Sequence, residues 1–281
     1  MKSPRQTLTS SLRRIALGAA TISLAQLALF GGGAQAQTVD KMLFLSTDVS
    51  GSISNLEYDT QRLGWSNAFL KPTIKTYIAA APNGIAVAVG QWDTIARSPL
   101  AIDWTHLTTA TSVDNFAAQL ATMARQGSGS TCVSCGINAA VASIQTAISS
   151  GLFDSATKII DISSDGIQNV GTDLIATVQA ARNNAASQGI NINALAIEGD
   201  FGPSGVSDYY NANVITPKPG AFVETVTGFT EFEEAATIKL QREVTHAPGP
   251  LPVFGALAAF GWAGRLRKRI SLSNLNLPAT A

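Results

Sequence analysis

The sequence predicts an α/β fold with a doubly wound, mostly parallel sheet and helices on both faces. Short apolar runs such as residues 43–47 and 85–89 have the length and composition of buried strands. Segments with helical spacing separate these runs, and strands that alternate with helices indicate a parallel sheet. Hydrophobic residues make up 46% of the 281 residues, enough to fill a core between the layers.

The first elements are set by apolar runs and by turn residues. The run that ends at Asp48 predicts a strand over residues 39–48, and helical spacing predicts a helix over 54–78. Pro72 is expected to end or kink that helix, because proline cannot donate the next backbone hydrogen bond. A Pro-Asn-Gly turn follows, and a second strand is expected over 85–92.

The middle of the chain continues the alternation. A third strand is expected over residues 98–104, paired antiparallel to the second as a hairpin. Helices are expected over 112–125 and 134–148, and the Gly- and Ser-rich residues 126–130 between them read as a polar loop. The β-branched run at 157–163 then predicts a buried strand.

The last part of the domain adds two more strands. An Ala-rich helix is expected over residues 172–188, followed by a strand over 190–197. Residues 201–220 lack a clear period and are expected to form a loop, which is long for a compact domain. An edge strand over 221–227 and a helix over 231–244 complete the prediction.

The formal net charge of zero hides an acidic centre. Eight of the 19 basic residues lie at the two ends of the chain, whereas all 19 acidic residues lie between Asp40 and Glu243. Residues 37–247 therefore carry 11 basic and 19 acidic side chains, a net charge of −8. An acidic domain argues against nucleic-acid binding.

Residues 1–36 have the three parts of a secretory signal peptide. A basic region ends at Arg13-Arg14, an apolar stretch follows over 15–30, and Ala34-Gln-Ala36 is a cleavage site of the A-x-A type. We expect cleavage after Ala36 and export to or beyond the periplasm. A retained membrane anchor is the alternative.

Residues 246–281 form a second targeting segment. A Pro-rich break is followed by an apolar run over 253–264 and a basic cluster over 265–269. This pattern resembles a PEP-CTERM-type sorting signal in the Pro-Gly-Pro-Leu-Pro variant, although residues 270–281 extend beyond the usual end. The resemblance implies processing by an exosortase in a Gram-negative or cyanobacterial cell, with transient membrane association through the apolar helix. An amphipathic or core helix is the alternative.

Oxygen-bearing side chains follow the predicted strand ends. Asp48, Ser50 and Ser52 lie on the loop that leaves the first strand, Thr131 precedes a helix, and Asp165 follows a later strand. Ligands of an open α/β sheet bind beyond the carboxyl ends of its strands. Carboxylate and hydroxyl oxygens gathered there suit a hard divalent cation such as Mg²⁺.

These pieces together resemble the metal-ion-dependent adhesion site (MIDAS) of von Willebrand factor A domains, which have a Rossmann-type fold. A narrower resemblance rests on Asp48-Val-Ser-Gly-Ser-Ile, on Glu57-x-x-x-Gln61-Arg62-x-Gly64 and on Asp161-Ile-Ser-Ser-Asp165-Gly. Over residues 39–245 the chain is similar to a bacterial von Willebrand factor A-like family known only as a domain of unknown function.

The resemblance implies a role for each matching residue. Ser50 and Ser52 would bind the ion directly, whereas Asp48, Asp165 and Thr131 would bind it directly or through water. One coordination position would stay open for an acidic group on a partner. Mg²⁺ is the expected ion, with Mn²⁺ or Ca²⁺ as alternatives. Two other interpretations stay open: a helix cap beside a solvated Asp-Gly turn, and a related fold that has lost the metal.

Cys132 and Cys135 are the only cysteines. An exported protein favours a disulfide between them, which would stiffen the segment that follows Thr131. Free thiols and a catalytic redox pair are the alternatives at this spacing.

We do not expect an enzyme. His106 and His246 are the only histidines, and the chain has neither a Gly-x-Ser-x-Gly elbow nor a phosphate-binding loop. The expected function is that of an exported or surface-sorted, metal-dependent protein-binding module of the adhesion type. Its partner would be an extracellular or surface protein with an acidic residue. A metal-stabilised structural or matrix protein is the main alternative, and a hydrolase is the lesser one.

Overall fold

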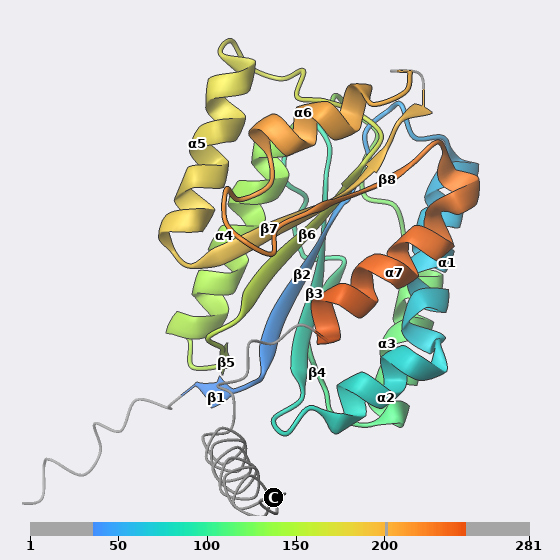
Figure 1. Cartoon of the computed structure of the whole chain (residues 1–281), viewed down its shortest axis with the longest axis vertical. Helices are drawn as coiled ribbons and strands as arrows, with labels where there is room; N and C mark the ends of the chain where they lie inside the picture. The colour runs from blue at the N-terminus through green and yellow to red at the C-terminus, as the bar shows by residue number, and fades with distance from the viewer. Residues whose placement is uncertain (1–35, 200–201, 246–281) are drawn as a thin grey trace, which may run out of the picture. The chain divides into compact units, whose positions relative to one another are not determined.

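The computed structural model describes residues 36–199 and 202–245. A six-stranded sheet lies at its centre, in the order β4-β3-β2-β6-β7-β8 (Figure 1). The strands are β2 (Lys41–Asp48), β3 (Ile85–Trp92), β4 (Ile102–Leu107), β6 (Lys158–Ser164), β7 (Ile190–Ile197) and β8 (Val223–Val226). Only β4 runs antiparallel to its neighbour, so the predicted doubly wound, mostly parallel sheet is confirmed.

The central strands are apolar on both faces because helices cover both. Every residue of β2 is buried. Leu43 and Leu45 join one hydrophobic cluster, whereas Met42 and Phe44 join a second cluster on the other face. Such continuous burial is typical of parallel strands, whose crossover helices pack on both sides.

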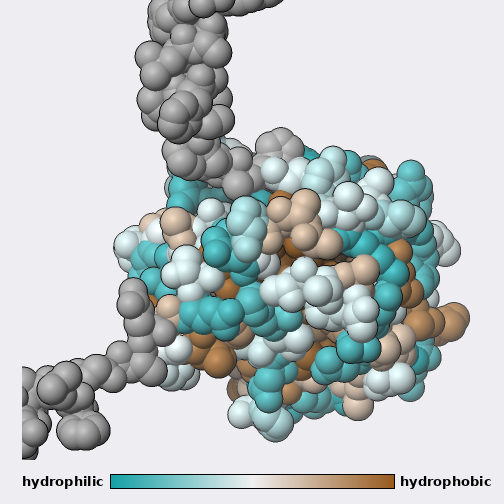
Figure 2. All heavy atoms as spheres, turned by 90° about the horizontal axis from the view of Figure 1, so that it is seen from below, coloured by the Kyte–Doolittle hydropathy of each residue, from teal (hydrophilic) through white to brown (hydrophobic). Residues whose placement is uncertain are grey.

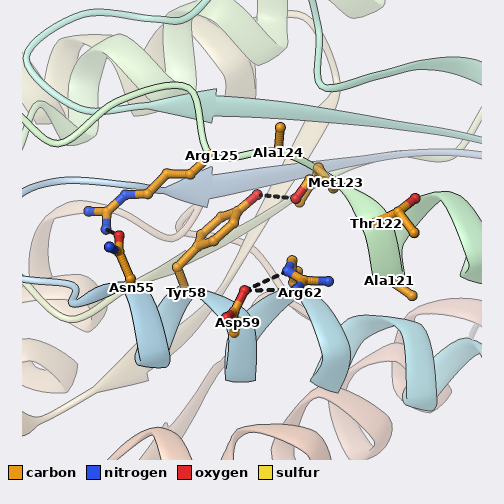
Figure 3. A pocket seen from close by; sticks show the side chains of 9 residues that line it. All are labelled: Asn55, Tyr58, Asp59, Arg62, Ala121, Thr122, Met123, Ala124 and Arg125. Carbon is orange, nitrogen blue, oxygen red and sulfur yellow. Dashed lines mark hydrogen bonds and ion pairs between the residues drawn. The ribbon is translucent and has the colours of Figure 1, made fainter.

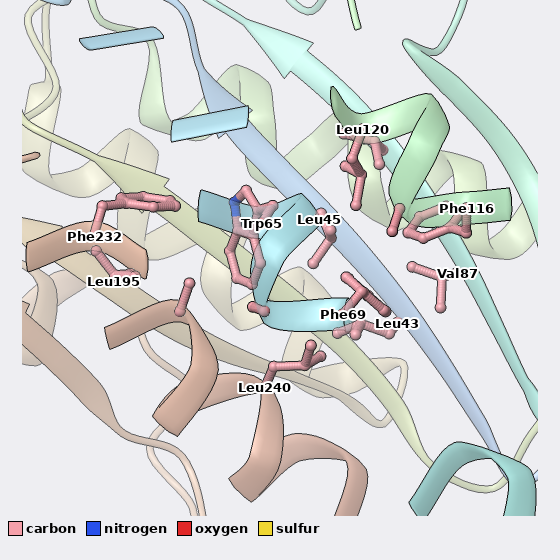
Figure 4. Close-up of a cluster of buried hydrophobic side chains, with 14 of the residues drawn as sticks. Leu43, Leu45, Trp65, Phe69, Val87, Phe116, Leu120, Leu195, Phe232 and Leu240 are labelled. Carbon is pink, nitrogen blue, oxygen red and sulfur yellow. The ribbon is translucent and has the colours of Figure 1, made fainter. Parts of the chain in front are cut away.

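The helices divide between the two faces of the sheet (Figure 1). One face carries α1 (Asn55–Leu70), α2 (Pro72–Ala80), α3 (Ala110–Thr122) and α7 (Phe232–Thr245); the other carries α4 (Val133–Ser149), α5 (Leu174–Ser187) and α6 (Gly205–Asn213). On the first face, Trp65 and Phe69 of α1 lie between α3 and α7 and pack on the sheet (Figure 4).

The structure agrees with the predicted break at Pro72, which is the first residue of α2. It contradicts the predicted loop over 201–220, because α6 lies within that segment. The Glu198 carboxylate accepts hydrogen bonds from the backbone N–H groups of Val206 (2.9 Å) and Ser207 (3.1 Å). The helix start is thus stabilised by a residue at the end of β7, a tertiary contact that local sequence pattern does not show.

Smaller differences concern short elements. The hairpin strand β4 begins at Ile102 rather than at residue 98. A two-stranded sheet of β1 (Gln37–Thr38) and β5 (Phe153–Asp154), and a 3₁₀ turn, η3 (Phe229–Glu231), were not expected. The signal-peptide and sorting-signal predictions lie outside the described residues, apart from Ala36. Within 36–199 and 202–245, no helix has the length and apolar character needed to cross a bilayer.

Charged side chains are buried where α7 packs on the sheet. Lys239 of α7 is fully buried, with its Nζ 2.6 Å from Asp161 Oδ1 and 2.7 Å from Glu243 Oε1. Lys41 at the start of β2 donates to the main-chain carbonyls of Glu243 and Val244. Burial, followed by the nearby charge of Glu243, raises the pKa of Asp161 well above its usual value. This network fixes the last helix against β2 and β6.

Candidate metal site

The candidate site lies where the strand order reverses. From β2 the chain adds β3 and β4 on one side, and β6, β7 and β8 on the other. Asp48 ends β2, and Asp165 directly follows β6, its parallel neighbour. The carboxyl ends of these strands therefore meet at one edge, the position at which open α/β sheets bind ligands.

A string of hydrogen bonds connects four of the predicted residues. The Ser50 N–H donates to Asp48 Oδ1 (2.7 Å), and the Oγ atoms of Ser50 and Ser52 lie 3.2 Å apart. Ser52 Oγ donates to Asp165 Oδ1 at 2.8 Å. Adjacent oxygens of an octahedral Mg²⁺ site lie about 2.9 Å apart, given Mg–O bonds of about 2.0–2.1 Å. The oxygen spacing therefore fits such an ion.

Thr131 reaches the same edge from the loop before α4. Its N–H donates to Asn169 Oδ1 (2.8 Å), and its carbonyl accepts from the Asn169 N–H (2.9 Å). The side chain faces the turn after β6, since a Cβ added to Gly166 would lie 3.4 Å from Thr131 Oγ1. The structure thus brings together all five residues that the sequence singles out.

Asp48 has the environment of a ligand to a cation. Its side chain is 0% exposed, and burial raises its pKa from 3.8 to about 7, against the hydrogen bonds from Ser164 and Ser50. The negative charge of Asp165 raises it further. No lysine or arginine of the described residues forms an ion pair with Asp48. A divalent cation at this edge would supply the missing positive charge.

The donor set combines two carboxylates with three hydroxyls. In the described part of the chain, no three His, Cys, Asp or Glu side chains gather closely enough to hold a metal. The hydroxyls of Ser50, Ser52 and Thr131 would have to complete the shell. Ser50 is buried, whereas Ser52 is exposed and Asp165 is half-buried. The set therefore opens to solvent on one side, where a further oxygen can enter.

Asp93 is a positioning residue that sequence analysis missed. It directly follows β3 and accepts hydrogen bonds from the N–H groups of Ser128 (3.0 Å) and Gly129 (2.8 Å). Burial raises its pKa, but the bonds from Arg97, Gly129 and Ile95 outweigh this and leave the pKa below 3.8. Asp93 directly follows β3, as Asp165 directly follows β6, and this place at a strand end is the signal that could have revealed it.

Asp93 holds the loop that contains Ser128 and Gly129, and this loop packs tightly on the loop that carries Ser50 and Ser52. The Gly51 N–H donates to the Gly129 carbonyl (2.7 Å), and a Cβ on Gly51 would lie 2.9 Å from the Ser128 carbonyl oxygen. Only glycine fits this approach without a shift of the backbone. Below the site, Ser164 Oγ donates to Asp48 Oδ2 at 2.6 Å, so both oxygens of Asp48 are fixed by neighbours.

Arg125 connects the same two loops, and Figure 3 shows its guanidinium beside Asn55. Its guanidinium donates to the carbonyls of Val49 (3.0 Å) and Ser50 (2.8 Å) and to Gly127 (2.7 Å). It also bonds to Asn55 Oδ1 at the start of α1 (3.1 Å). Arg125 thereby fixes the backbone that carries Ser50 without contacting the candidate ligand oxygens.

Replacing Arg125 with lysine should weaken Mg²⁺ binding about tenfold or more. Lysine cannot reproduce a planar fork to several carbonyls, and hydrogen bonds to charged groups are worth about 1.5–3 kcal/mol. Titration calorimetry with Mg²⁺ measures the change. Arg62→Lys is the matched control, because Arg62 and Arg125 line one surface pocket (Figure 3) but Arg62 pairs with Asp59. Equal Mg²⁺ affinity in both variants would contradict this role.

Cys132 and Cys135 form a disulfide in the structure. Cys132 is the N-cap of α4 and directly follows Thr131. The Cys132 N–H donates to the carbonyl of Asp93 (3.0 Å). The disulfide is therefore connected both to Thr131, a candidate ligand, and to Asp93, which holds the neighbouring loop.

Replacing both cysteines with serine should lower the unfolding free energy by about 2 kcal/mol, the loop-entropy value for so short a ring. Mg²⁺ affinity should fall with it, because the Thr131 backbone becomes less fixed. Thermal unfolding and calorimetry of the variant measure the two effects. A variant with unchanged Mg²⁺ affinity would show that the bridge does not position Thr131.

The sheet order and the helices on both faces define a von Willebrand factor A-like fold, and the candidate ligands lie at one edge of its sheet. The family model described as "protein of unknown function (DUF1194)" matches residues 38–248. The chain belongs to that family. Among curated proteins, none matches the sequence.

Solved structures match this fold at low sequence identity. Proximal thread matrix protein 1 of the mussel byssus, solved with zinc in its MIDAS motif, has a TM-score of 0.51 at 18% identity, over 73% of this chain and 48% of that one. The pilus adhesin SpaC of Lactobacillus rhamnosus GG has a TM-score of 0.54 at 16% identity, over 76% and 31%. A von Willebrand factor type A protein of Catenulispora acidiphila has a TM-score of 0.52 at 15% identity, over 74% and 43%. The chain spans about half the length of the first structures that it matches.

Proposed function

We propose that the chain is an exported, divalent-cation-dependent protein-binding module of the adhesion type, and that it is not an enzyme. The observation that carries this proposal is the string of hydrogen bonds from Asp48 to Asp165. Among the described residues, no Lys or Arg pairs with its buried end, and its other end opens to solvent. Asp48, Ser50, Ser52, Thr131 and Asp165 would hold the ion.

The donor set favours recognition of an acidic group. Three of the five proposed ligands are neutral hydroxyls, and an octahedral ion has a sixth coordination position that a carboxylate oxygen of a partner could fill. Ser52 and Asp165 form the solvent-facing rim at which a partner's Asp or Glu side chain would enter. Mg²⁺ is the proposed ion, and Mn²⁺ or Ca²⁺ could fill the same oxygen set.

The neighbours and the chain ends support the extracellular part of this proposal. Two proteins of similar fold are a matrix protein with a zinc-occupied MIDAS motif and a pilus adhesin. The predicted signal peptide and sorting signal would deliver this chain to the cell surface or the extracellular matrix. An exosortase-type enzyme would be the processing partner.

His106, the histidine within the described residues, is engaged in hydrogen bonds. Both ring nitrogens of His106 are engaged, Nδ1 with the side-chain amide of Gln37 (3.1 Å) and Nε2 with the carbonyl of Asn83 (2.8 Å). The hydrogen-bond partners of both ring nitrogens are therefore groups other than a serine hydroxyl. This arrangement supports a binding role over a hydrolytic one.

Binding to paired peptide probes tests the proposed function. Immobilised glutamate-containing peptides should retain the protein in Mg²⁺, whereas the same peptides with glutamine should not. EDTA and Asp48→Ala should each abolish retention. If the cation raises the melting temperature but no glutamate peptide retains the protein, the ion has a structural role only and the adhesion function is wrong.

The stabilisation by Mg²⁺ should grow between pH 5 and pH 8. The folded-state pKa of Asp48, about 7, lies above its usual value of 3.8. The folded state therefore holds the proton more tightly, and the stability of the metal-free protein falls as pH rises from about 4 to about 7. Between pH 5 and pH 8 this fall is on the order of 2–3 kcal/mol. Mg²⁺ would offset that loss by neutralising the carboxylate. Melting temperatures with and without Mg²⁺ at several pH values measure the effect, and a shift independent of pH would contradict it.

A further inference from the structure

A second cavity lies at the opposite end of the sheet from the metal site. It has a volume of about 700 Å³ and lies among the first residues of β6 and β7, the loop before β8 and the last turns of α7. Ile159, Pro219 and Phe222 supply apolar lining, and Asn191, Lys218 and Arg242 supply polar lining. We call it the basal pocket. Its volume lies within the roughly 300–1,000 Å³ of small-molecule sites.

Hydrophobic surface is set among polar groups at this end of the domain. Figure 2 views the molecule from below, the end at which β2 begins, and shows brown hydrophobic atoms recessed between teal and white ones. A pocket that combines apolar walls with a few polar groups can hold an organic molecule in one orientation.

The basal pocket is basic although the domain is acidic. Lys158, Lys218 and Arg242 line it, against the single acid Glu243. Glu243 is already matched by the buried Lys239 (2.7 Å). In the described part of the chain, no carboxylate forms an ion pair with Lys158 or Lys218. The pocket therefore has positive charge in excess, within a segment of net charge −8.

Arg242 is held in place at the rim. Its guanidinium lies over the Phe222 ring, 3.4 Å from the ring centroid, and 3.7 Å from the Glu224 carboxylate. Stacking on an aromatic face fixes the plane of the guanidinium, which then matches the planar, two-oxygen geometry of a carboxylate. The fixed Arg242 and the exposed Lys218 form two cationic points beside an apolar wall.

We propose that the basal pocket binds a small organic carboxylate with an apolar body. The carboxylate would lie against Lys218 and Arg242, and the body against Ile159, Pro219 and Phe222. The C-terminal segment of this chain cannot supply the anion from a side chain, because residues 246–281 contain no Asp or Glu. This site does not depend on the proposed metal site, which lies at the other edge of the sheet.

Three small molecules test the proposal on the ¹⁵N-labelled protein by NMR titration, because they separate the effect of the charge from that of the ring. Benzoate has both charge and an apolar ring, benzamide lacks the charge, and acetate lacks the ring. Benzoate should shift the backbone amides of Asn191, Gly220 and Phe222. Benzamide and acetate should each bind at least about tenfold more weakly than benzoate, a loss of at least about 1.4 kcal/mol in binding free energy. Inorganic phosphate should shift these amides no more than acetate does.

Substitutions separate the pocket from general charge effects. Lys218→Gln and Arg242→Gln should each weaken benzoate binding about tenfold, whereas Lys75→Gln, on α2 outside the pocket, should leave it unchanged. EDTA should have no effect. If benzoate at concentrations up to about 10 mM, which would reveal even weak binding, shifts none of these backbone amides, the proposal is wrong. Equal binding of benzamide, or unchanged affinity in a folded Lys218→Gln variant, would also overturn it.

Discussion

Replacing Lys239 with methionine is expected to lower the free energy of unfolding by about 3–5 kcal/mol, the range for breaking one side of a buried ion pair. Lys239 is fully buried and bonds both Asp161 (2.6 Å) and Glu243 (2.7 Å). Methionine fills a similar volume but leaves two buried carboxylates without their cation. For a domain of this size the melting temperature should fall by roughly 6–20 °C.

Two further variants separate charge from packing. Gln241→Met, an exposed position on the same helix, should change stability by less than about 0.5 kcal/mol. The triple variant Lys239→Met, Asp161→Leu, Glu243→Gln should recover most of the loss, because no unpaired charge remains buried. If Lys239→Met alone is as stable as the unchanged protein, the network does not hold α7 in the way described.

The second large effect concerns Asp48→Asn, which should abolish the response to divalent cations without destabilising the metal-free protein. Asparagine keeps the shape and an accepting oxygen for the Ser50 N–H, but it removes a fully buried charge. Since burial raises the pKa of Asp48 to about 7, the metal-free variant should gain up to about 4 kcal/mol at pH 8.

Thermal unfolding at pH 8, with EDTA and with Mg²⁺, measures both parts of this prediction. The unchanged protein should gain stability from Mg²⁺, whereas Asp48→Asn should start from an equal or higher melting temperature and show no gain. A variant that is less stable in EDTA would mean that Asp48 has a structural role in the metal-free fold. A variant that still responds to Mg²⁺ would place the cation elsewhere.

Local pattern was sufficient for the central part of the fold. The continuous apolar runs of β2, β3 and β7 give strands because both faces are covered, and Pro72 ends α1 because its geometry is fixed by covalent structure. Helix α6 was missed because Glu198, at the end of β7, caps it through space. Its polar composition carries no helical period strong enough to show this.

In the candidate site too, some features could be predicted from the sequence and others depend on contacts through space. Asp48, Ser50, Ser52, Thr131 and Asp165 could be predicted because their order along the chain and their places at strand ends are visible in the sequence. The place of Asp93 after a strand is also visible in the sequence, but the contacts that fix these loops are not. Asp93 acts through backbone N–H groups 35 and 36 residues away, and Arg125 acts on carbonyls that every residue possesses. Such contacts depend on the folded path of the loops and leave no mark on composition or spacing.

Titration calorimetry with Mg²⁺ and Mn²⁺ tests the central claim most directly, with the unchanged chain compared with Asp165→Ala. Asp165 accepts a hydrogen bond from Ser52 at the solvent-facing end of the site, so the substitution removes a candidate ligand without emptying the core. We predict one cation per chain for the unchanged protein and a loss of binding in Asp165→Ala. Absence of heat with either ion, or equal binding by the variant, would contradict the proposed metal site.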